Sequence, residues 1–506
     1  MESAKKKVAI IGGGISGLTA GIYALDNDFD VTIYEKHYIP GGQCTGWTRK
    51  NIEIDGCAHW IVGTNPRSDL FPLWKHIGAF SESTEFYQTE YFTKFDIDGK
   101  IVTIWKDIYK LYAELVRLAP EDKRKIRKFI RWIKAYQHVR IPVKKPMDRM
   151  NILELIKFGL DFLPMLVPYF IAKHLSCKQY AKRFKNKNLR YIFENILCGD
   201  YNVHSLFYVL QAVTMSDTAV IKGGSLQVIR NITHKYEEKG GKLVLSKPVD
   251  KIIVENGVAK GILFKDGTSE KDDYVIAACD AHHVLYDLLD GKYTDSYYKH
   301  RYQDIERYPL NTGMLVSFKV TKDISDRPKM IVFKVPEFDI GGMKVNFLSV
   351  RNHSYTKENK DDATTLTVLI ATDERVYDYF KQFKDKKSYV NAKMSVGKIV
   401  EKEIYRYFSL DDSNCELIDV TTPLTYERYT NAYHGSYQSF ITTSRSHGLM
   451  RGGKLNGLKN FVLSGQWLMP PGGLPIALFT GKHAAYRLCD MEHKKFIDRE
   501  KEDIIN

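Results

Sequence analysis

Short apolar runs and polar turns alternate over the first forty residues. Val8–Ile11 is an apolar run of strand length, and a second run from Val31 to Tyr34 ends at an acidic residue. Between them, small and apolar positions recur with helical spacing from Leu18 to Leu25. The pattern predicts a strand, a helix and a second strand, which together form one βαβ unit.

The same alternation continues in later blocks. It predicts a hairpin over 95–104 that turns at Asp98-Gly99, and an amphipathic helix over 120–139 with a basic outer face. An α/β block, a second α+β domain and a closing strand and helix follow, with elements expected at 226–239, 242–245, 249–254, 258–264, 274–278, 313–320, 330–335, 344–350, 364–371, 388–407 and 460–489.

Length and composition describe a globular protein of two or three domains. The chain has 506 residues, of which 44% are hydrophobic and 27% charged. Its seven cysteines are scattered without a CxxC pair, which favours a reducing compartment and argues against a disulfide framework or a metal site. The first apolar run is only as long as a strand, so we expect no secretory signal.

The net charge of +14 is concentrated in two basic clusters. Residues 117–149 carry twelve lysines and arginines against three acids, and residues 173–190 carry seven basic residues and no acid. Such clusters suit nucleic acid or an anionic membrane, although the basic face of one helix is often only solvated. No nucleic-acid-binding motif accompanies the charge, so we expect a membrane surface and no nucleic acid.

The segment between these clusters, residues 152–172, is strongly apolar. It contains three charged residues and is interrupted by Pro164 and Pro168, so its charge-free stretch is shorter than the ~20 residues of a membrane span. It is either a buried helical subdomain or a patch lying in the bilayer interface. The basic flanks favour the second alternative, and we expect a cytoplasmic protein that is peripheral at the membrane.

The turn after the first strand carries candidate chemistry. Gly12-x-Gly14-x-x-Gly17 permits a tight turn, a close approach to a pyrophosphate and close packing of the helix. Glu35, at the end of the second strand, is placed to bind ribose hydroxyls and disfavours the 2′-phosphate of NADP. The motif therefore predicts a dinucleotide site, the alternative being a loop with only a folding role. The pair Gly41-Gly42 could return to the same pyrophosphate or form an ordinary turn.

Three blocks carry a family resemblance when they are taken in order. They are the βαβ unit with the following PGGQCT and DGCAHW stretches, the α/β block over 222–280, and the Pro/Gly loop and helix over 460–489. Together they resemble the phytoene desaturase and carotenoid isomerase-like FAD-dependent oxidoreductases of the flavin amine oxidase superfamily. Thr422–Tyr429 is similar to a stretch that lies near the substrate cavity in that branch, which also includes retinol saturase-like proteins.

The resemblance implies an α/β fold. A Rossmann-like FAD-binding domain is expected with a discontinuous α+β substrate domain and a helical, membrane-facing insertion. The implied boundaries are 1–70, 221–290 and 456–506 for the FAD-binding domain, and 71–220, which holds the insertion, and 291–455 for the substrate domain.

The resemblance also implies the cofactor and its ligands. FAD is expected alone, because no second GxGxxG is present for a nicotinamide domain. Gln43 stands where many members have arginine, and Gln466 where most have aspartate. The expected FAD-binding residues are Gly12, Gly14, Ile15, Ser16, Gly17, Glu35, Lys36, Gly41, Gly42, Gln43, Val249, Gly465, Gln466, Leu474, Pro475 and Ala477.

The implied reaction is desaturation, saturation or cis–trans isomerisation at C–C bonds of a long apolar polyene or unsaturated lipid, such as a carotenoid or retinoid. Electrons would pass to a quinone, to oxygen or to an outside reductase. Candidates beside the flavin or the substrate are His59, Trp60, Tyr429 and His434, although His59 could equally be a structural loop residue. The alternatives are a flavin amine oxidase and a flavin-containing lipid carrier without turnover.

Overall fold

Strand β1 (Lys7–Ile11) leads through the glycine-rich turn into helix α1 (Ile15–Leu25) at the centre of a parallel sheet. Strand β2 (Asp30–Tyr34) follows, so the predicted βαβ unit is confirmed. This is a computed structural model that describes residues 4–57, 60–197, 200–355, 363–446, 448, 450–500 and 502. The five-stranded sheet has the order β10-β2-β1-β14-β20, in which the added strands are β10 (Lys242–Val244), β14 (Tyr274–Ala277) and β20 (Phe461–Leu463).

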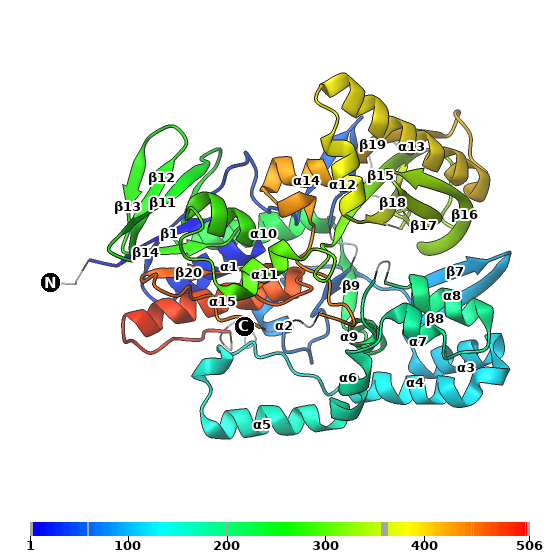
Figure 1. The fold of residues 1–506 in the computed structure, drawn as a ribbon, viewed down its shortest axis with the longest axis horizontal. Coiled ribbons are helices and arrows are strands. Elements are labelled where there is room, and N and C mark those ends of the chain that lie inside the picture. Colours follow the sequence, from blue (N-terminus) through cyan, green and yellow to red (C-terminus); the bar gives the residue numbers. More distant parts are fainter. Residues whose placement is uncertain are drawn as a thin grey trace.

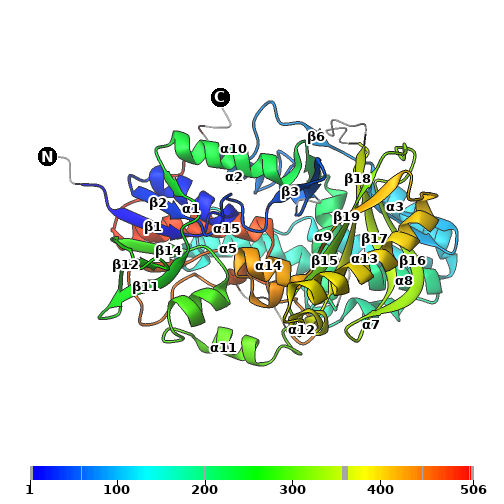
Figure 2. The same cartoon turned by 90° about the horizontal axis from the view of Figure 1, so that it is seen from above.

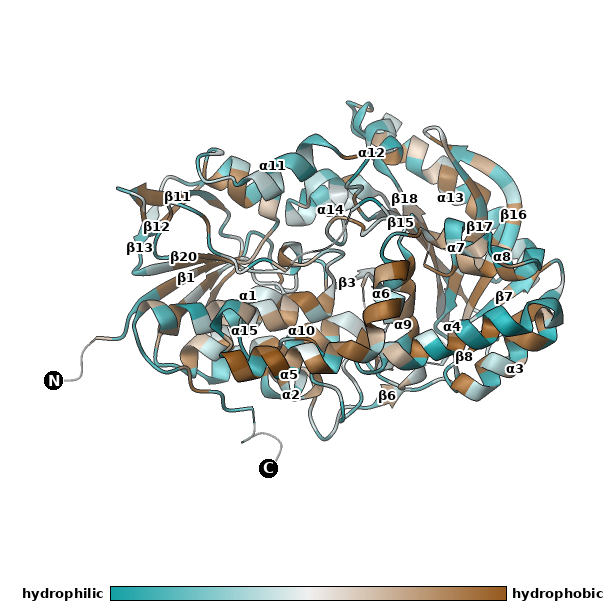
Figure 3. Ribbon diagram, turned by 60° about the horizontal axis from the view of Figure 1, so that its bottom comes forward, coloured by the Kyte–Doolittle hydropathy of each residue, from teal (hydrophilic) through white to brown (hydrophobic). Residues whose placement is uncertain are grey.

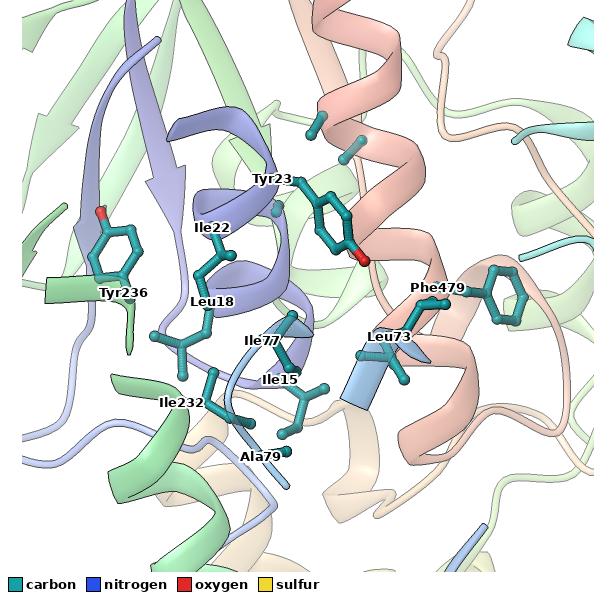
Figure 4. Packing of buried hydrophobic residues seen from close by; sticks show 14 of the residues in the cluster. Ile15, Leu18, Ile22, Tyr23, Leu73, Ile77, Ala79, Ile232, Tyr236 and Phe479 are labelled. Atoms are coloured by element: carbon teal, nitrogen blue, oxygen red, sulfur yellow. The ribbon is translucent and has the colours of Figure 1, made fainter. Parts of the chain in front are cut away.

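Both faces of the parallel sheet are buried, which explains its continuous apolar runs. Val8 and Ile10 point to one face, and Ala9 and Ile11 to the other. Helices cover the first face, where Leu18, Ile22 and Tyr23 of α1 pack among them (Figure 4). The covering elements are α2 (Phe71–His76), α10 (Gly224–Glu238) and α15 (Leu474–Met491) on that face, and the antiparallel strands β11 (Val249–Glu255), β12 (Val258–Phe264) and β13 (Ser269–Lys271) on the other.

A second, seven-stranded sheet forms the other half of the molecule (Figure 1). Helix α13 (Lys386–Phe408) runs along its outer face together with α12 (Glu374–Lys381), as the view from above shows (Figure 2). The predicted hairpin and strands are present, in the order β19 (Cys415–Thr421), β15 (Thr312–Val320), β18 (Thr364–Thr372), β17 (Met343–Asn352), β16 (Met330–Ile340), β7 (Tyr91–Ile97) and β8 (Lys100–Trp105).

A cluster of helices packs on the β7–β8 end of this sheet. The predicted amphipathic helix is α4 (Lys123–Tyr136), whose Ile126, Phe129 and Ile133 are buried while its lysines and arginines are exposed. Its neighbours are α3 (Ile108–Leu118), α7 (Cys177–Ala181), α8 (Lys187–Asn195) and α9 (Val203–Thr214).

Short elements join the two halves. Strands β3 and β4 form a hairpin, and β9 pairs with both β5 and β6. The bounds of these and the remaining elements are β3 (Gly46–Arg49), β4 (Ile52–Asp55), β5 (Ile61–Val62), β6 (Phe86–Tyr87), β9 (Thr218–Ile221), α11 (Ser296–Gln303) and α14 (Pro423–Thr430).

The apolar segment forms two helices that meet at a bend. Helix α5 (Ile152–Phe162) has no buried residue, and after a 3-10 turn at 163–165 helix α6 (Leu166–Ala172) rises toward α9 (Figure 1). Colouring by hydropathy shows both helices as apolar and lying at the surface (Figure 3). By length and composition alone, Ile152–Ala172 could cross a membrane, with a mean hydropathy of 1.6 over its best 18-residue window and 17% of that window buried. The bend divides the segment into two helices, each shorter than a membrane-spanning helix. That the segment does not cross a membrane stays a prediction.

Candidate cofactor and substrate site

The glycine turn is shaped by two close backbone approaches. Gly12 has φ +104°, and a Cβ on it would lie 2.9 Å from the carbonyl oxygen of Ala278. A Cβ on Gly17 would lie 1.9 Å from the carbonyl oxygen of Gly12, so α1 can pack against β1 only without a side chain there. The start of α1, at Gly14, Ile15 and Ser16, lines a cavity, so the free N–H groups of its first turn are available to a ligand there.

The second glycine pair returns to this turn. The Gly41 N–H donates to the carbonyl oxygen of Gly13 at 2.8 Å, and Gly14 and Gly41 form an isolated parallel bridge. Gly14 has no such restriction of its own, because a Cβ there would meet no atom closer than 3.7 Å. The absence of a side chain at Gly14 keeps open space in front of the helix, as expected where a pyrophosphate approaches.

Glu35 is held rigidly at the end of β2. It is 6% exposed, and its two carboxylate oxygens accept hydrogen bonds from the backbone N–H groups of Gly13 and His37, each at 2.8 Å. Its carboxylate lies on the cavity wall, where each oxygen keeps a lone pair for a further donor. Lys36 follows, with its ammonium group bonded to the carbonyl oxygen of Arg428 at 3.0 Å and to Asn431. Burial lowers the pKa of Lys36.

The C-terminal block brings a second helix N-terminus to the same cavity. The Gly473 N–H, just before α15, donates to Oε1 of Gln466 at 3.0 Å. The Gly465 N–H donates to Oγ1 of Thr480 at 3.1 Å, which fixes the loop on the helix. The hydroxyls of Ser16 and Ser464 lie 2.6 Å apart and join the first turn to this block.

One continuous cavity of about 1250 Å³ connects these features to the apolar helices. This volume exceeds the roughly 300–1,000 Å³ of an ordinary small-molecule site. From the glycine turn the cavity passes between the two sheets and reaches α5, α6 and α9. Its far wall is mainly apolar and aromatic, formed by Phe158, Phe162, Met165, Leu166, Tyr169, Tyr208 and Val209.

The structure gathers nearly all the predicted cofactor residues around the same cavity, away from this apolar wall. Gly17 lies beneath the cavity lining, in the contact between α1 and β1. The residues that line the cavity are Gly12, Gly14, Ile15, Ser16, Glu35, Lys36, Gly41, Gly42, Gln43, Val249, Gly465, Gln466, Leu474, Pro475 and Ala477. They come from three distant parts of the sequence, which the parallel sheet brings together.

The four candidates for a catalytic role are distributed differently. Trp60 lines the cavity, and Tyr429 lines its rim with 45% of its surface exposed. His434 is not among the cavity-lining residues: its Nδ1 lies 2.6 Å from a carboxylate oxygen of Glu374, and its ring stacks on Tyr377. His59 lies outside the described residues.

Sequence reasoning missed two buried ionisable residues on the cavity wall, Asp280 and Arg351. Asp280 follows β14, where burial raises the pKa of its carboxyl to about 7. Arg351 lies in β17 of the other sheet. The signal for Asp280 was its place just after a buried strand. Arg351 has only the weak signal of an arginine within an apolar strand.

A glycine turn on a parallel sheet, joined through one cavity to a mixed sheet, defines a Rossmann-like dinucleotide-binding α/β fold. Solved structures confirm this fold. An oxidoreductase from Methanosarcina mazei matches with TM-score 0.59 and 15% identity, covering 96% of this chain and 100% of that one. A putrescine oxidase matches with TM-score 0.59 and 14% identity, covering 96% and 99%.

Sequence comparison confirms the predicted resemblance to phytoene desaturase-type proteins. Residues 10–77 match the family model of the NAD(P)-binding Rossmann-like domain. The neurosporene-forming phytoene desaturase of Cereibacter sphaeroides is 27% identical over 318 residues, 58% of each chain. A diaponeurosporene-forming 4,4′-diapophytoene desaturase of Staphylococcus aureus is 21% identical over 510 residues, 94% of this chain and 97% of that one.

A further relative is described as an inactive all-trans-retinol 13,14-reductase of Danio rerio, 24% identical over 276 residues, 52% of this chain and 45% of that one. The chain spans 54–61% of the length of the first three curated relatives it matches. What these relatives act on is therefore a starting point for a proposal.

Proposed function

We propose that this protein is an FAD-dependent oxidoreductase acting on C–C bonds of a long apolar polyene or unsaturated lipid. The observation that carries the proposal is the single cavity, which joins a dinucleotide site at one end to exposed apolar helices at the other. A small polar substrate would need neither that length nor that apolar wall. The desaturases among the relatives support a polyene as the substrate.

The cavity wall fits FAD. The start of α1 and the glycines beside it would hold the pyrophosphate, and Glu35 would accept hydrogen bonds from the ribose hydroxyls. Lys36 and Val249 line the cavity and would lie beyond the ribose, while Gln43, Gly465 and Gln466 would face the flavin half. When bound, FAD supplies two-electron redox chemistry at its flavin ring.

The chain itself contributes orientation, charge stabilisation and exclusion of water. The free N–H groups at the start of α15 present a positive dipole end to the cavity, which favours an electron-rich ring over a neutral one. The apolar wall from α5 to α9 keeps water from the substrate. Trp60 borders this region and would position the chain of the substrate.

Helices α5 and α6 would place the cavity mouth on an anionic membrane. Leu153, Leu160, Val167 and Phe170 are each more than half exposed, an arrangement that costs free energy in water and is relieved in the bilayer interface. Helix α4, with its exposed basic face, lies along the same lower edge of the molecule (Figure 1). A lipid-soluble substrate would enter from the membrane, and a membrane quinone is a suitable electron acceptor. The protein would then be cytoplasmic and peripheral.

The test is the absorbance spectrum of the purified protein, followed without oxygen as a carotenoid or a membrane-lipid extract is added. A flavin band that bleaches on addition indicates a desaturase. Activity that appears only after reduction with dithionite indicates a saturase or an isomerase.

Three other outcomes would contradict the proposal. Bleaching by small amines alone would identify an amine oxidase, the first alternative. Tight lipid binding without any turnover would indicate a carrier. A colourless protein that FAD cannot reconstitute would exclude the proposed function and both alternatives, since all three require a bound flavin.

A further inference from the structure

Arg351 stands out among the cations of the cavity wall. It lies near the end of β17, in register with Met330 of β16 and Thr367 of β18, and is 9% exposed. Other lysines and arginines on the wall, such as Arg49 and Lys393, are more exposed and lie near the carboxylate of Asp419. Among the lysines and arginines that line the described part of the cavity, Arg351 is therefore the buried one.

Buried cations elsewhere in the described structure have protein partners. Lys106 donates to the carbonyl oxygen of Thr218 at 2.8 Å, and Lys482 pairs with Asp498 at 2.7 Å. Arg487 is bonded to the carboxylate of Asp148 through both Nη atoms. These pairs show how the fold normally compensates a buried positive charge.

The guanidinium of Arg351 lacks such compensation among the described residues. Its Nε and Nη1 are buried and have no hydrogen-bond partner, and no described carboxylate forms an ion pair with it. The acid that influences it, Asp55, is already engaged with the hydroxyl of Ser225 at 2.6 Å and the Cys57 N–H at 2.9 Å. A buried cation with orphan donors is strongly unfavourable unless a ligand binds it.

A small basic recess lies directly beyond Arg351. It has a volume of about 40 Å³ and shares Trp60 and Arg351 with the main cavity. Lys106, Lys329 and His353 also line it, and none of its lining residues is acidic. A recess of this size accommodates a group not much larger than one water molecule. Its chemistry and size suit the oxygen atoms of one carboxylate.

We infer that Arg351 binds a carboxylate at the head of the substrate, which is then a long-chain unsaturated acid rather than a hydrocarbon. This inference rests on the proposed function and specifies its substrate class. The fork of N–H groups on a guanidinium matches a carboxylate in a bidentate pair. The carboxylate lies at Arg351 and the recess, and the apolar tail extends along the cavity toward α5 and α6. The polar end thus sets how far the chain enters, and so which C–C bond meets the flavin.

The experiment compares sodium oleate with oleyl alcohol, which have the same chain and differ in the head group. Binding to the FAD-loaded protein is followed by perturbation of the flavin band and by equilibrium dialysis with radiolabelled ligand. Arg351→Met removes the charge at similar length, and Arg351→Lys keeps it. Arg49→Met is the matched control, because Arg49 is a cavity-wall cation with its charge already opposed by Asp419.

We expect wild type to bind oleate at least about 10-fold more tightly than oleyl alcohol, since a hydrogen bond between two charged groups is stronger than one to a neutral hydroxyl. Arg351→Met should abolish this preference by weakening oleate alone, Arg351→Lys should retain part of it, and Arg49→Met should leave it intact.

Two results would overturn the inference. Equal binding of the acid and the alcohol by wild type would show that no carboxylate is recognised. Loss of FAD from Arg351→Met would assign the guanidinium to the cofactor instead. A protein that binds no FAD in any form fails the proposed function itself, which keeps the two failures distinguishable.

Discussion

Gln466 donates a hydrogen bond from its side-chain Nε2 to Oε1 of Gln43, 3.1 Å away. Both residues stand where the resemblance to phytoene desaturase-type proteins leads one to expect a charged side chain, arginine at position 43 and aspartate at position 466. The structure shows that these two side chains touch each other. Both side chains are neutral amides, so this contact on the cavity wall carries no net charge.

The first prediction concerns this pair. Gln466→Asp alone should weaken FAD binding, because it places a carboxylate on the cavity wall without the arginine that would oppose it. Gln43→Arg should recover most of the loss in the double variant, with a coupling energy of about 1 kcal/mol or more. FAD dissociation constants measured for the four proteins of the cycle give this value. Additive effects would show that the two positions act independently.

Two glycines of the turn should differ in their roles, Gly14 in FAD binding and Gly17 in the stability of the fold. Gly14→Ala should change the free energy of unfolding of the FAD-free protein by less than about 0.5 kcal/mol. The new Cβ would make only an ordinary van der Waals contact, with its nearest atom at 3.7 Å. It should nevertheless weaken FAD binding about 10-fold or more, because the methyl group occupies the approach of the pyrophosphate. Calorimetry without FAD and a binding titration measure the two quantities.

Gly17→Ala is the matched contrast in the same turn. Its Cβ would lie 1.9 Å from a backbone oxygen, so the FAD-free protein itself should be destabilised by several kcal/mol. If Gly14→Ala destabilised the fold equally, the space in front of α1 would have no specific relation to a ligand.

The carboxyl of Asp280 should make stability depend on pH. Its two oxygens accept three backbone hydrogen bonds, from Tyr433, His282 and His283, and burial raises its pKa to about 7. Because this folded-state pKa lies above the unfolded value of about 3.9, the folded protein holds an extra proton between the two. The stabilisation of the folded state by the protonated Asp280 carboxyl is therefore fully present below pH 4. It is lost as the pH rises to 7, which lowers the free energy of unfolding by up to about 4 kcal/mol.

Melting temperatures between pH 4 and pH 8 test this prediction. Asp280→Asn cannot titrate, so its curve should lack this decline, although the lost acceptor lowers its stability at every pH. Parallel curves for the two proteins would contradict the assignment.

Charges on the exposed apolar helices should remove membrane binding without harming the fold. Leu153→Glu and Val167→Glu alter side chains that are 73% and 70% exposed, so melting temperatures should change little. Sedimentation with vesicles of phosphatidylcholine and phosphatidylglycerol should fall at least several-fold. Ile399→Glu on α13, at a site 40% exposed, is the control and should sediment like wild type. No sedimentation of wild type would argue against a membrane contact.

The buried charge of Arg351 should lower the stability of the ligand-free protein. Removing a buried charge that has no partner among the described residues relieves a desolvation penalty, so Arg351→Met should melt at the same temperature as wild type or a few degrees higher. Oleate should then raise the melting temperature of wild type more than that of the variant. A variant that melts well below wild type would assign Arg351 a structural role.

The sequence was most informative where function depends on local backbone shape. The turn from Gly12 to Gly17 needs glycine for contacts within a few residues, and Glu35 follows at a fixed distance along one βαβ unit. Their roles in the fold could be predicted because both periodicity and spacing are local. The contact of Gly41 with Gly13 could also be anticipated, since both lie at the same end of adjacent elements.

Features that depend on distant pairing could not be predicted in this way. His434 was a candidate because of its neighbours in sequence, yet Glu374, sixty residues away, binds it outside the cavity. Arg351 gains its surroundings from strands β16 and β18, whose register no local pattern specifies. For residues 152–172, apolar composition is equally compatible with a buried and an exposed helix, and only tertiary packing decides between them.

The parallel sheet has a consequence for how the protein is made. Strand β20 and helix α15, which complete the cofactor cavity, are synthesised long after the other strands of the parallel sheet. Until then β14 presents an unpaired edge and the cavity lacks one wall. Loading of the cofactor must therefore follow the synthesis of α15. From the synthesis of β14 until that of β20, the nascent chain carries an open sheet edge as well as the exposed apolar helices α5 and α6, which makes it a natural client for chaperones.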